Sequence, residues 1–240
     1  MSDFDYTLHY SAFHDVSEMH ADQMASYISK LIVKYLPSDL NAKIVDVGCG
    51  FGFALLALKQ LGYHDIQGVE ISSQQAAQCR SMGFNVEVTE NTIEWISTKK
   101  NTFDCVLIMD VIEHVPVDQQ IQMMASIRAS LKEGGRVILT TPNANAILAN
   151  RWRYIDFTHH SSFTEHSLNF VLKNAGFTKI MIDNSKGLNV FPKRIWKKEV
   201  RNALRKIIVR WLWLQVFKAE LTFDEIQKIS FDLNLLAVAE

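Results

Sequence analysis

Two acidic residues and three glycines in the first third of the chain have the types and spacing of a nucleoside-binding site. The run Asp46-Val47-Gly48-Cys49-Gly50-Phe51-Gly52 begins within a short β-branched segment, and Glu70 ends a second such segment. Glycines let the backbone turn sharply and approach a ligand at points where a Cβ would collide. A carboxylate in the position of Glu70 can accept hydrogen bonds from both hydroxyls of a ribose.

The spacing of these glycines differs from that of a dinucleotide site. The dinucleotide pattern Gly-x-Gly-x-x-Gly requires a sixth-position glycine, and this chain has Phe53 there. Asp46 also places a negative charge where a pyrophosphate would be repelled. A cationic nucleoside without phosphates therefore fits the site better, although a Rossmann-like domain for some other nucleotide is the alternative.

The run Asp46-x-Gly48-x-Gly50-x-Gly52 with Glu70 resembles the cofactor site of class I S-adenosylmethionine-dependent methyltransferases. Later segments match that family in order: a fourth strand over 103–110, a loop over 111–115, and a helix end, glycine cap and fifth strand over 131–142. The resemblance implies an α/β fold with a doubly wound, seven-stranded, mostly parallel sheet whose last strand is antiparallel. It also implies S-adenosylmethionine as cofactor, bound by Asp46, Gly48, Cys49, Gly50, Gly52, Glu70, Ile71, Glu90, Met109 and Asp110.

Composition limits the remaining classes of protein. The chain has 240 residues and a formal net charge of −1, so no global positive field would recruit nucleic acid. Its three cysteines lack metal-ligand spacing and suggest reduced thiols. The first residues carry neither the basic nor the apolar region of a signal peptide, and no run of about 18 apolar residues occurs. We expect a cytoplasmic protein with one methyltransferase domain over 1–240.

The alternation of patterns along the chain is typical of a parallel sheet with crossover helices. Strands are expected at 44–47, 66–70, 84–88, 104–109, 136–141, 177–182 and 233–239, and helices at 17–36, 53–62, 73–82, 118–132 and 164–175. Residues 1–40 form an amino-terminal arm and helix. The arm contains Tyr6, His9, Tyr10, Phe13 and His14 and either folds over the cofactor or packs on the sheet edge.

A helical insertion over 190–225 separates the last two strands. Within 192–214, apolar residues recur every three to four positions: Trp196, Val200, Ala203, Leu204, Ile207, Trp211 and Leu214. Lysines and arginines fall largely on other faces of that helix. Such a helix suits peripheral contact with an anionic membrane at its inner face, or packing on the domain or on a second subunit of a homodimer. Nucleic acid is the weaker option.

The segment 154–166 concentrates groups suited to acid–base chemistry at the ligand-binding edge of the sheet. It contains His159, His160 and Asp156, and a carboxylate can orient an imidazole that takes a proton from a hydroxyl. The segment resembles the Asp-x-Thr-His stretch of bacterial methyltransferases that act on sugars. His159 occupies the position of the single histidine in that stretch and is the preferred base.

His114 competes for the same role. The Glu-His-Val stretch at 113–115 also resembles ubiquinone-pathway O-methyltransferases, in which acidic residues are implicated in binding a divalent ion. Asp110 and Glu113 could act likewise, but two carboxylates on one loop are insufficient for such a site. We expect no metal ligands, with His114 hydrogen-bonded locally and Asp110 positioning the methionine end of the cofactor.

The resemblance of these segments implies an O-methyltransferase that acts on a sugar hydroxyl in bacterial surface-polysaccharide assembly. The acceptor would be a small molecule or a lipid-linked glycan. One alternative is methylation of a quinone or another lipid. The other is a non-catalytic scaffold, which the intact Asp46, the three glycines and Glu70 argue against.

Overall fold

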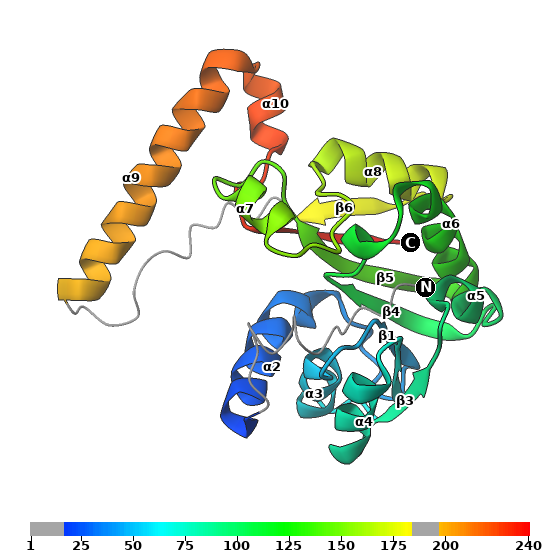
Figure 1. The fold of residues 1–240 in the computed structure, drawn as a ribbon. Coiled ribbons are helices and arrows are strands. Elements are labelled where there is room, and N and C mark those ends of the chain that lie inside the picture. Colours follow the sequence, from blue (N-terminus) through cyan, green and yellow to red (C-terminus); the bar gives the residue numbers. More distant parts are fainter. Residues whose placement is uncertain (1–16, 184–196) are drawn as a thin grey trace.

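The computed structural model describes residues 17–183 and 197–240. Seven strands form one open sheet in the order β3-β2-β1-β4-β5-β7-β6 (Figure 1). The strands are β1 (Ile44–Val47), β2 (Ile66–Glu70), β3 (Asn85–Val88), β4 (Phe103–Met109), β5 (Leu131–Pro142), β6 (Ile180–Asp183) and β7 (Asn234–Ala239). The predicted doubly wound α/β fold is confirmed.

The last strand differs in direction from the first five. The pairs from β3 through β5 are parallel, whereas β7 runs antiparallel to both β5 and β6 and lies between them. The order reverses at β1 and β4, so the carboxyl ends of these two strands open the crevice in which such sheets bind ligands. The glycine run follows β1, and the acidic loop follows β4.

Helices cover both faces of the sheet because its central strands are apolar on both sides. They are α2 (Glu18–Ile32), α3 (Phe53–Gln60), α4 (Ser73–Ser81), α5 (Thr92–Ser97), α6 (Val117–Ser130), α7 (Ala149–Tyr154), α8 (Glu165–Asn174), α9 (Lys197–Glu220) and α10 (Phe223–Lys228), with single 3₁₀ turns at Val33–Tyr35 and Ile112–His114. Alternate residues of each strand face opposite layers. In β4, Val106 and Ile108 pack with α6 and α8, and Leu107 packs with α2 and α3.

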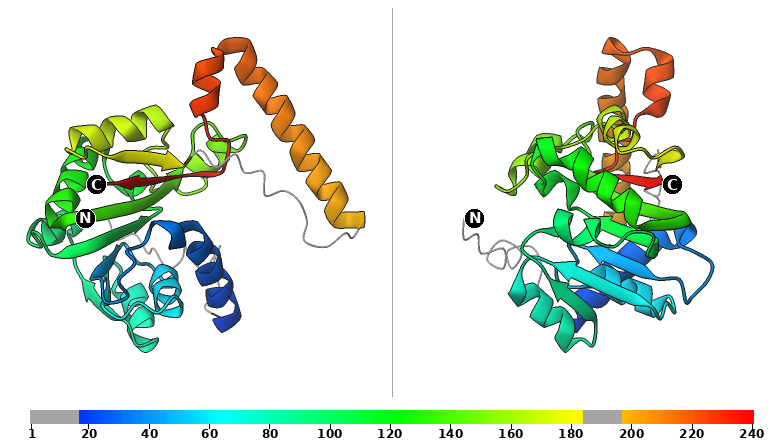
Figure 2. Two further views of the ribbon diagram at one scale, coloured as in Figure 1. Left: turned by 180° about the vertical axis from the view of Figure 1, so that it is seen from behind. Right: turned by 90° about the vertical axis from the view of Figure 1, so that its right-hand side faces the viewer.

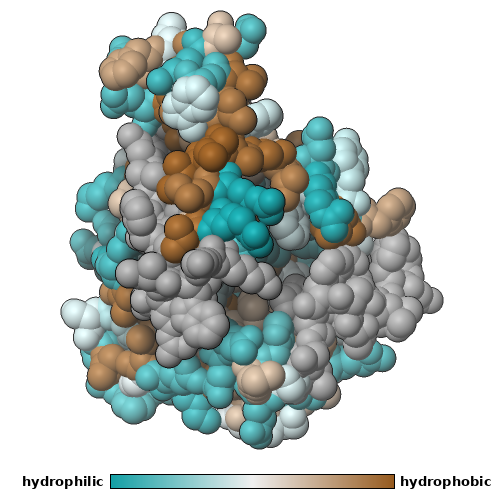
Figure 3. Space-filling view, turned by 90° about the vertical axis from the view of Figure 1, so that its left-hand side faces the viewer, coloured by the Kyte–Doolittle hydropathy of each residue, from teal (hydrophilic) through white to brown (hydrophobic). Residues whose placement is uncertain are grey.

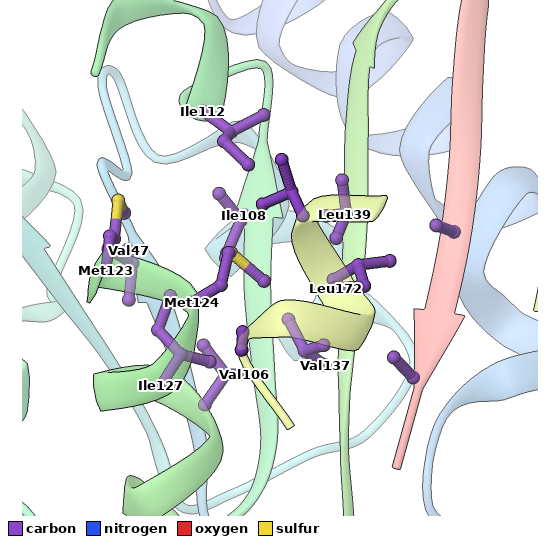
Figure 4. Packing of buried hydrophobic residues seen from close by; sticks show 14 of the residues in the cluster. Val47, Val106, Ile108, Ile112, Met123, Met124, Ile127, Val137, Leu139 and Leu172 are labelled. Atoms are coloured by element: carbon purple, nitrogen blue, oxygen red, sulfur yellow. The ribbon is translucent and has the colours of Figure 1, made fainter. Parts of the chain in front are cut away.

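The larger cluster lies between the sheet and helices α6 and α8 (Figure 4). Met123, Met124 and Ile127 of α6 meet strand residues such as Val106, and all of them are at most 1% exposed. Burying an aliphatic side chain of this size stabilises the fold by roughly 1.5–3 kcal/mol. This packing holds β4 rigidly and thereby fixes the start of the loop that follows it.

Two predicted details are wrong. The glycine pair at Gly134 and Gly135 lies inside β5 and does not cap a helix, since α6 already ends at Ser130. The register against β4 shifts there, Gly134 has φ +73°, and a Cβ on Gly135 would lie 2.9 Å from the Lys132 carbonyl. The pair therefore permits a bulge against β4. The expected loop after β5 also contains a helix, α7, that the sequence reasoning missed.

The insertion after β6 contains two helices. α9 extends away from the sheet, and α10 returns the chain toward β7 (Figure 1 and the left view of Figure 2). The aromatic arm at 1–16 and the beginning of the insertion, including Trp196, lie outside the described residues. In the part that is described, no helix combines the length and the apolar character needed to cross a membrane.

Candidate active site

The glycine run after β1 adopts a conformation that other residues rarely adopt. Gly48, Gly50 and Gly52 have φ values of +73°, +52° and +79°. A Cβ on Gly48 would lie 2.7 Å from Cγ2 of Val111, in the loop after β4. Gly52 is the N-cap of α3. The glycines therefore let the cofactor loop pack directly against the loop that carries Glu113 and His114.

Glu70 lies at the end of β2, with its carboxylate directed at the backbone of the cofactor loop. Its Oε2 accepts a hydrogen bond from the Gly50 N–H at 2.9 Å, and its Oε1 accepts from the N–H groups of Ile71 and Ser72 at 2.9 Å each. A carboxylate has about four acceptor sites, so three are used in this way. One acceptor site, on Oε2, remains for a ribose hydroxyl. Hydrogen bonds to both ribose hydroxyls, as predicted, would require one of the hydrogen bonds from the backbone N–H groups to break.

Asp46 is a buried carboxylate whose surroundings suit a positively charged ligand. The residue is 1% exposed, and its Oδ1 has no hydrogen-bond partner. Burial, together with the nearby charge of Glu70, raises the pKa of Asp46 to about 7. An unpaired buried carboxylate is costly unless a positive group accompanies it. S-adenosylmethionine carries such groups on its methionine part, so the residues present fit this cofactor.

The other predicted cofactor contacts lie around the same crevice. Ile71, next to Glu70, is 43% exposed. Its apolar side chain could therefore pack against the adenine ring of the cofactor. Glu90 is exposed just after β3, and Met109 is half-buried at the end of β4. Cys49 is buried, and a hydrogen bond with Cys79 and its burial raise the pKa of its thiol. Cys49 is therefore an uncharged packing residue of the loop.

Asp110 is held at the junction of three strands. It has φ +56°, which is uncommon outside glycine, and its Oδ1 accepts from Thr140 Oγ1 at 3.0 Å and from Asn234 Nδ2 at 2.8 Å. Desolvation raises the pKa of Asp110, and the Thr140 bond opposes that shift. Burial raises the pKa of the Tyr27 phenol in α2, and the nearby charge of Asp110 raises it further.

Glu113 connects the loop after β4 with the segment after α7. Its carbonyl accepts from the His160 N–H at 2.7 Å, and its carboxylate Oε2 accepts from Thr141 Oγ1 at 3.0 Å. Its Oε1 is buried without a hydrogen-bond partner. Burial first, and then the Asp110 charge, raise the pKa of Glu113. The side chain of His160 is exposed, so this residue contributes its backbone to the site.

A chain of hydrogen bonds links Asp156 to His114. Asp156 Oδ1 accepts from Thr158 Oγ1 at 2.6 Å, and the same hydroxyl lies 2.8 Å from His114 Nδ1. A threonine hydroxyl has one proton, and an ionised carboxylate can only accept. The hydroxyl proton therefore points to Asp156, and His114 Nδ1 must carry a hydrogen. This assignment leaves the lone pair of the neutral imidazole on Nε2.

His159 is held differently. Its Nδ1 donates to the Trp152 carbonyl at 3.0 Å, and its Nε2 lies 3.9 Å from Asp156 Oδ2. The ring lies edge-on against that of His114, with 4.6 Å between ring centroids. Desolvation lowers the pKa of His159, although the Asp156 charge opposes the shift. The lone pair of His159 thus points at a carboxylate, whereas Asp156 orients His114 through Thr158.

Three of these side chains could share a metal ion. Single ligand atoms of Glu113, His114 and His159 all lie within 4.8 Å of one another. A carboxylate with two imidazoles is a donor set typical of zinc and similar transition ions. The pair considered from the sequence was Asp110 with Glu113, and the Asp110 Oδ1 instead bonds Thr140 and Asn234.

Sequence reasoning missed several residues that complete the site. Thr158 is the threonine of the Asp-x-Thr-His stretch. It follows Asp156 by two residues, which is the spacing at which an aspartate side chain forms a local turn with the backbone. Asn234 and Tyr27 gave no signal, because only the folded chain brings them to Asp110. Thr164 is the N-cap of α8, and Ser167 closes its capping box.

Comparison with curated proteins gives relatives over part of the chain. A ubiquinone biosynthesis O-methyltransferase of Paraburkholderia xenovorans is 32% identical over 107 residues, covering 42% of this chain and 45% of the relative. One of Cereibacter sphaeroides is 27% identical over 143 residues, covering 52% and 57%. The chain thus spans about half the length of the curated relatives it matches.

Comparison with solved structures extends over nearly the whole chain. A SAM-dependent methyltransferase from Archaeoglobus fulgidus has a TM-score of 0.64 at 20% identity, covering 94% of this chain and 99% of that one. Phosphoethanolamine N-methyltransferase 2 of Haemonchus contortus, solved with S-adenosyl-L-methionine, has a TM-score of 0.58 at 16% identity, covering 90% and 52%. Residues 20–181 match the family described as a methyltransferase domain. The chain therefore belongs to the methyltransferase domain family, and its fold is the class I fold of SAM-dependent methyltransferases.

Proposed function

We propose that the enzyme methylates an aromatic hydroxyl of a quinone precursor or a related lipid. The observation that carries this proposal is the chain of hydrogen bonds from Asp156 through Thr158 to His114, beside a loop with exposed apolar side chains. The names of the curated relatives support the same acceptor class. A sugar hydroxyl, the acceptor predicted from the sequence, has less support.

The segment 147–157, which we assign to acceptor binding, exposes apolar surface where a sugar site would need hydrogen-bonding groups. Phe157 is 87% exposed and Tyr154 74%, and both are close in sequence to Asp156. Ile147 and Leu148, just before α7, are also exposed. An apolar rim with a few polar groups at its base suits an aromatic ring that carries an apolar tail. Removing such an acceptor from water would also cover these side chains.

The residues divide the reaction into binding and proton transfer. Asp46 and Glu70 would hold the cofactor, which supplies an electrophilic methyl group when bound. A hydroxyl is a weak nucleophile until a base takes its proton. His114 takes that proton on Nε2, and Thr158 and Asp156 stabilise the resulting imidazolium through Nδ1. The buried carboxyl group of Glu113 lies close to the same ring.

A competition between acceptors tests the proposal. Purified enzyme with S-adenosylmethionine would receive a polyprenylated catechol, an unprenylated catechol, and an undecaprenyl-linked sugar, and products would be measured by mass spectrometry. We expect methylation of the catechols, with the lower KM for the prenylated one. Phe157→Ser should raise that KM and leave the KM for the unprenylated compound nearly unchanged. Preferential methylation of the sugar would contradict the proposal.

A further inference from the structure

Helix α9 presents an apolar strip to solvent. Leu204, Ile208, Trp211, Leu212 and Val216 are each between 52% and 58% exposed. Leu204, Ile208, Leu212 and Val216 lie four residues apart, and Trp211 lies three residues after Ile208, so these side chains share one face of the helix. Figure 3 views the side of the molecule on which α9 lies and shows hydrophobic residues gathered in its upper half. A contiguous apolar surface of this kind marks an interaction site.

The remaining side of α9 is already attached to the domain. Trp213 Nε1 donates to the Asn145 carbonyl at 2.9 Å, and its ring contacts Phe217, which in turn contacts Phe231. Arg210 pairs with Asp232 at 3.1 Å. These contacts fix which side of the helix is turned to the protein. The strip with Trp211 is thus a defined surface and does not result from a helix free to rotate.

The positive charge around the apolar strip of α9 indicates which kind of partner binds there. From Val200 to Ala219 the helix contains no aspartate or glutamate. Arg201, Arg205, Lys206 and Lys218 are exposed, and none of them forms an ion pair within the part of the chain that the structure describes. A second copy of α9 packed on this face would oppose these cations with more cations. An anionic lipid surface instead accepts the apolar side chains and attracts the basic ones.

We propose that α9 docks the enzyme on an anionic membrane surface, with Trp211 and Leu212 entering the boundary between headgroups and acyl chains. Tryptophan favours this boundary because its ring is apolar and its N–H can reach a polar partner. The inference does not depend on the acceptor. A membrane-bound enzyme could act on any hydroxyl that the crevice admits.

Sedimentation with sucrose-loaded vesicles tests the inference. Vesicles of phosphatidylcholine with about 30% phosphatidylglycerol would be compared with pure phosphatidylcholine, at about 0.1 M and 0.5 M salt. We expect pelleting with the anionic vesicles at low salt, little at high salt, and little with the neutral ones. Each cation near the surface should contribute roughly a fivefold change in partition. The triple variant Arg201→Glu, Arg205→Glu, Lys206→Glu should therefore lose binding.

Two further variants make the result specific. Lys30→Glu, Lys100→Glu, Lys173→Glu changes the net charge equally on exposed lysines elsewhere and should pellet as the wild type does. Trp211→Ser with Leu212→Ser should reduce binding at unchanged net charge. Circular dichroism would verify the fold of each variant, and methylation of a short soluble acceptor should be unaffected in all of them.

Three results would overturn the inference. One is the absence of wild-type pelleting with anionic vesicles at low salt. Another is equal loss in the remote-lysine variant, since attraction would then be nonspecific. The third is a wild-type dimer in analytical ultracentrifugation that Trp211→Ser with Leu212→Ser dissociates, because the strip would then be an interface between copies. None of these results bears on the hydroxyl that is methylated.

Discussion

The cofactor half and the acceptor half of the proposed active site are built by different means. The cofactor half, which comprises the glycine loop after β1 and Glu70, is shaped mainly by backbone conformation. Three glycines with positive φ shape the loop, and the carboxylate of Glu70 accepts hydrogen bonds from the N–H groups of Gly50, Ile71 and Ser72. In the acceptor half, side chains distant in sequence meet, as in the contact between His114 and Thr158. The cofactor half can therefore be recognised from a short sequence motif, whereas the acceptor half forms only when distant segments meet in the fold.

This difference has a functional consequence. A backbone cradle fits one ligand shape and tolerates few substitutions, so it suits a cofactor that stays the same. Side-chain contacts between loops can change one residue at a time and so alter the acceptor while the sheet remains. The acceptor half also contains the group that we propose to move a proton. Substitutions in the two halves should accordingly separate binding of the cofactor from catalysis.

The largest effect is expected at His114. His114→Ala should lower kcat by about 10²–10⁴, because the acceptor hydroxyl loses its base, while the Kd for S-adenosylmethionine changes little. His159→Ala is the matched control in the same ring pair and should lower kcat by less than about tenfold. Steady-state kinetics and calorimetric titration provide both numbers. A larger loss in His159→Ala would restore the base preferred from the sequence.

The next effect is expected at Glu70. Glu70→Ala removes a buried charge-assisted acceptor and should weaken cofactor binding by roughly 2–4 kcal/mol, or about 30-fold to 1000-fold. Because Glu70 also bonds three backbone N–H groups, the variant should have a lower Tm without cofactor. Calorimetry and thermal unfolding would measure the two effects. An unchanged affinity would remove Glu70 from the cofactor site.

A pH-dependent effect is expected at Asp46. With a pKa of about 7, its carboxylate becomes protonated below neutrality and loses attraction for a cation, so affinity should fall by up to about tenfold per pH unit below 7. Asp46→Asn should bind weakly at every pH and show no such slope. Titrations between pH 6 and pH 9 would test this; a slope that persists in the variant would place the titrating group elsewhere.

Asp46 also makes a prediction about stability, with the opposite sign from a salt-bridged acid. Its pKa in the folded protein is raised above the unfolded value near 3.9, so it favours folding when protonated. The free energy of unfolding without cofactor should fall as pH rises from about 4 to 7 and then level off. Asp46→Asn should therefore raise the cofactor-free Tm at pH 8, where wild-type Asp46 is charged and buried.

The smallest effect is expected at Thr158. Thr158→Val keeps the shape of the side chain but removes the hydroxyl between Asp156 and His114. The imidazolium would lose its link to the carboxylate, and kcat should fall by about tenfold with KM nearly unchanged. Thr158→Ser is the control and should keep nearly full activity.

The contrast between the halves also explains what the sequence could predict. The strands, the crevice, the glycine conformations and Glu70 follow from patterns within a few residues. The bulge at Gly134 was missed because a glycine pair after a helix is usual for a cap, and tertiary pairing with β4 decided otherwise. Asn234 reaches Asp110 from the last strand, a juxtaposition that no local pattern contains.

Chelation offers a contrasting account of the acceptor half. If Glu113, His114 and His159 held an ion, both histidines would be needed, and a chelator would abolish activity until a metal was returned. The proton-transfer account predicts activity that is unchanged after dialysis against a chelator. It also predicts no protection against thermal unfolding by added zinc at equimolar concentration.

Chemical rescue is the most direct test of the claim that the acceptor half takes a proton at His114. The small variant His114→Gly would be assayed with a catechol acceptor at increasing concentrations of imidazole, and His159→Gly would serve as the control. The account predicts that imidazole restores a saturable part of the lost rate in His114→Gly, with a pH dependence that follows the added base. A saturable rescue of His159→Gly with none for His114→Gly would contradict it.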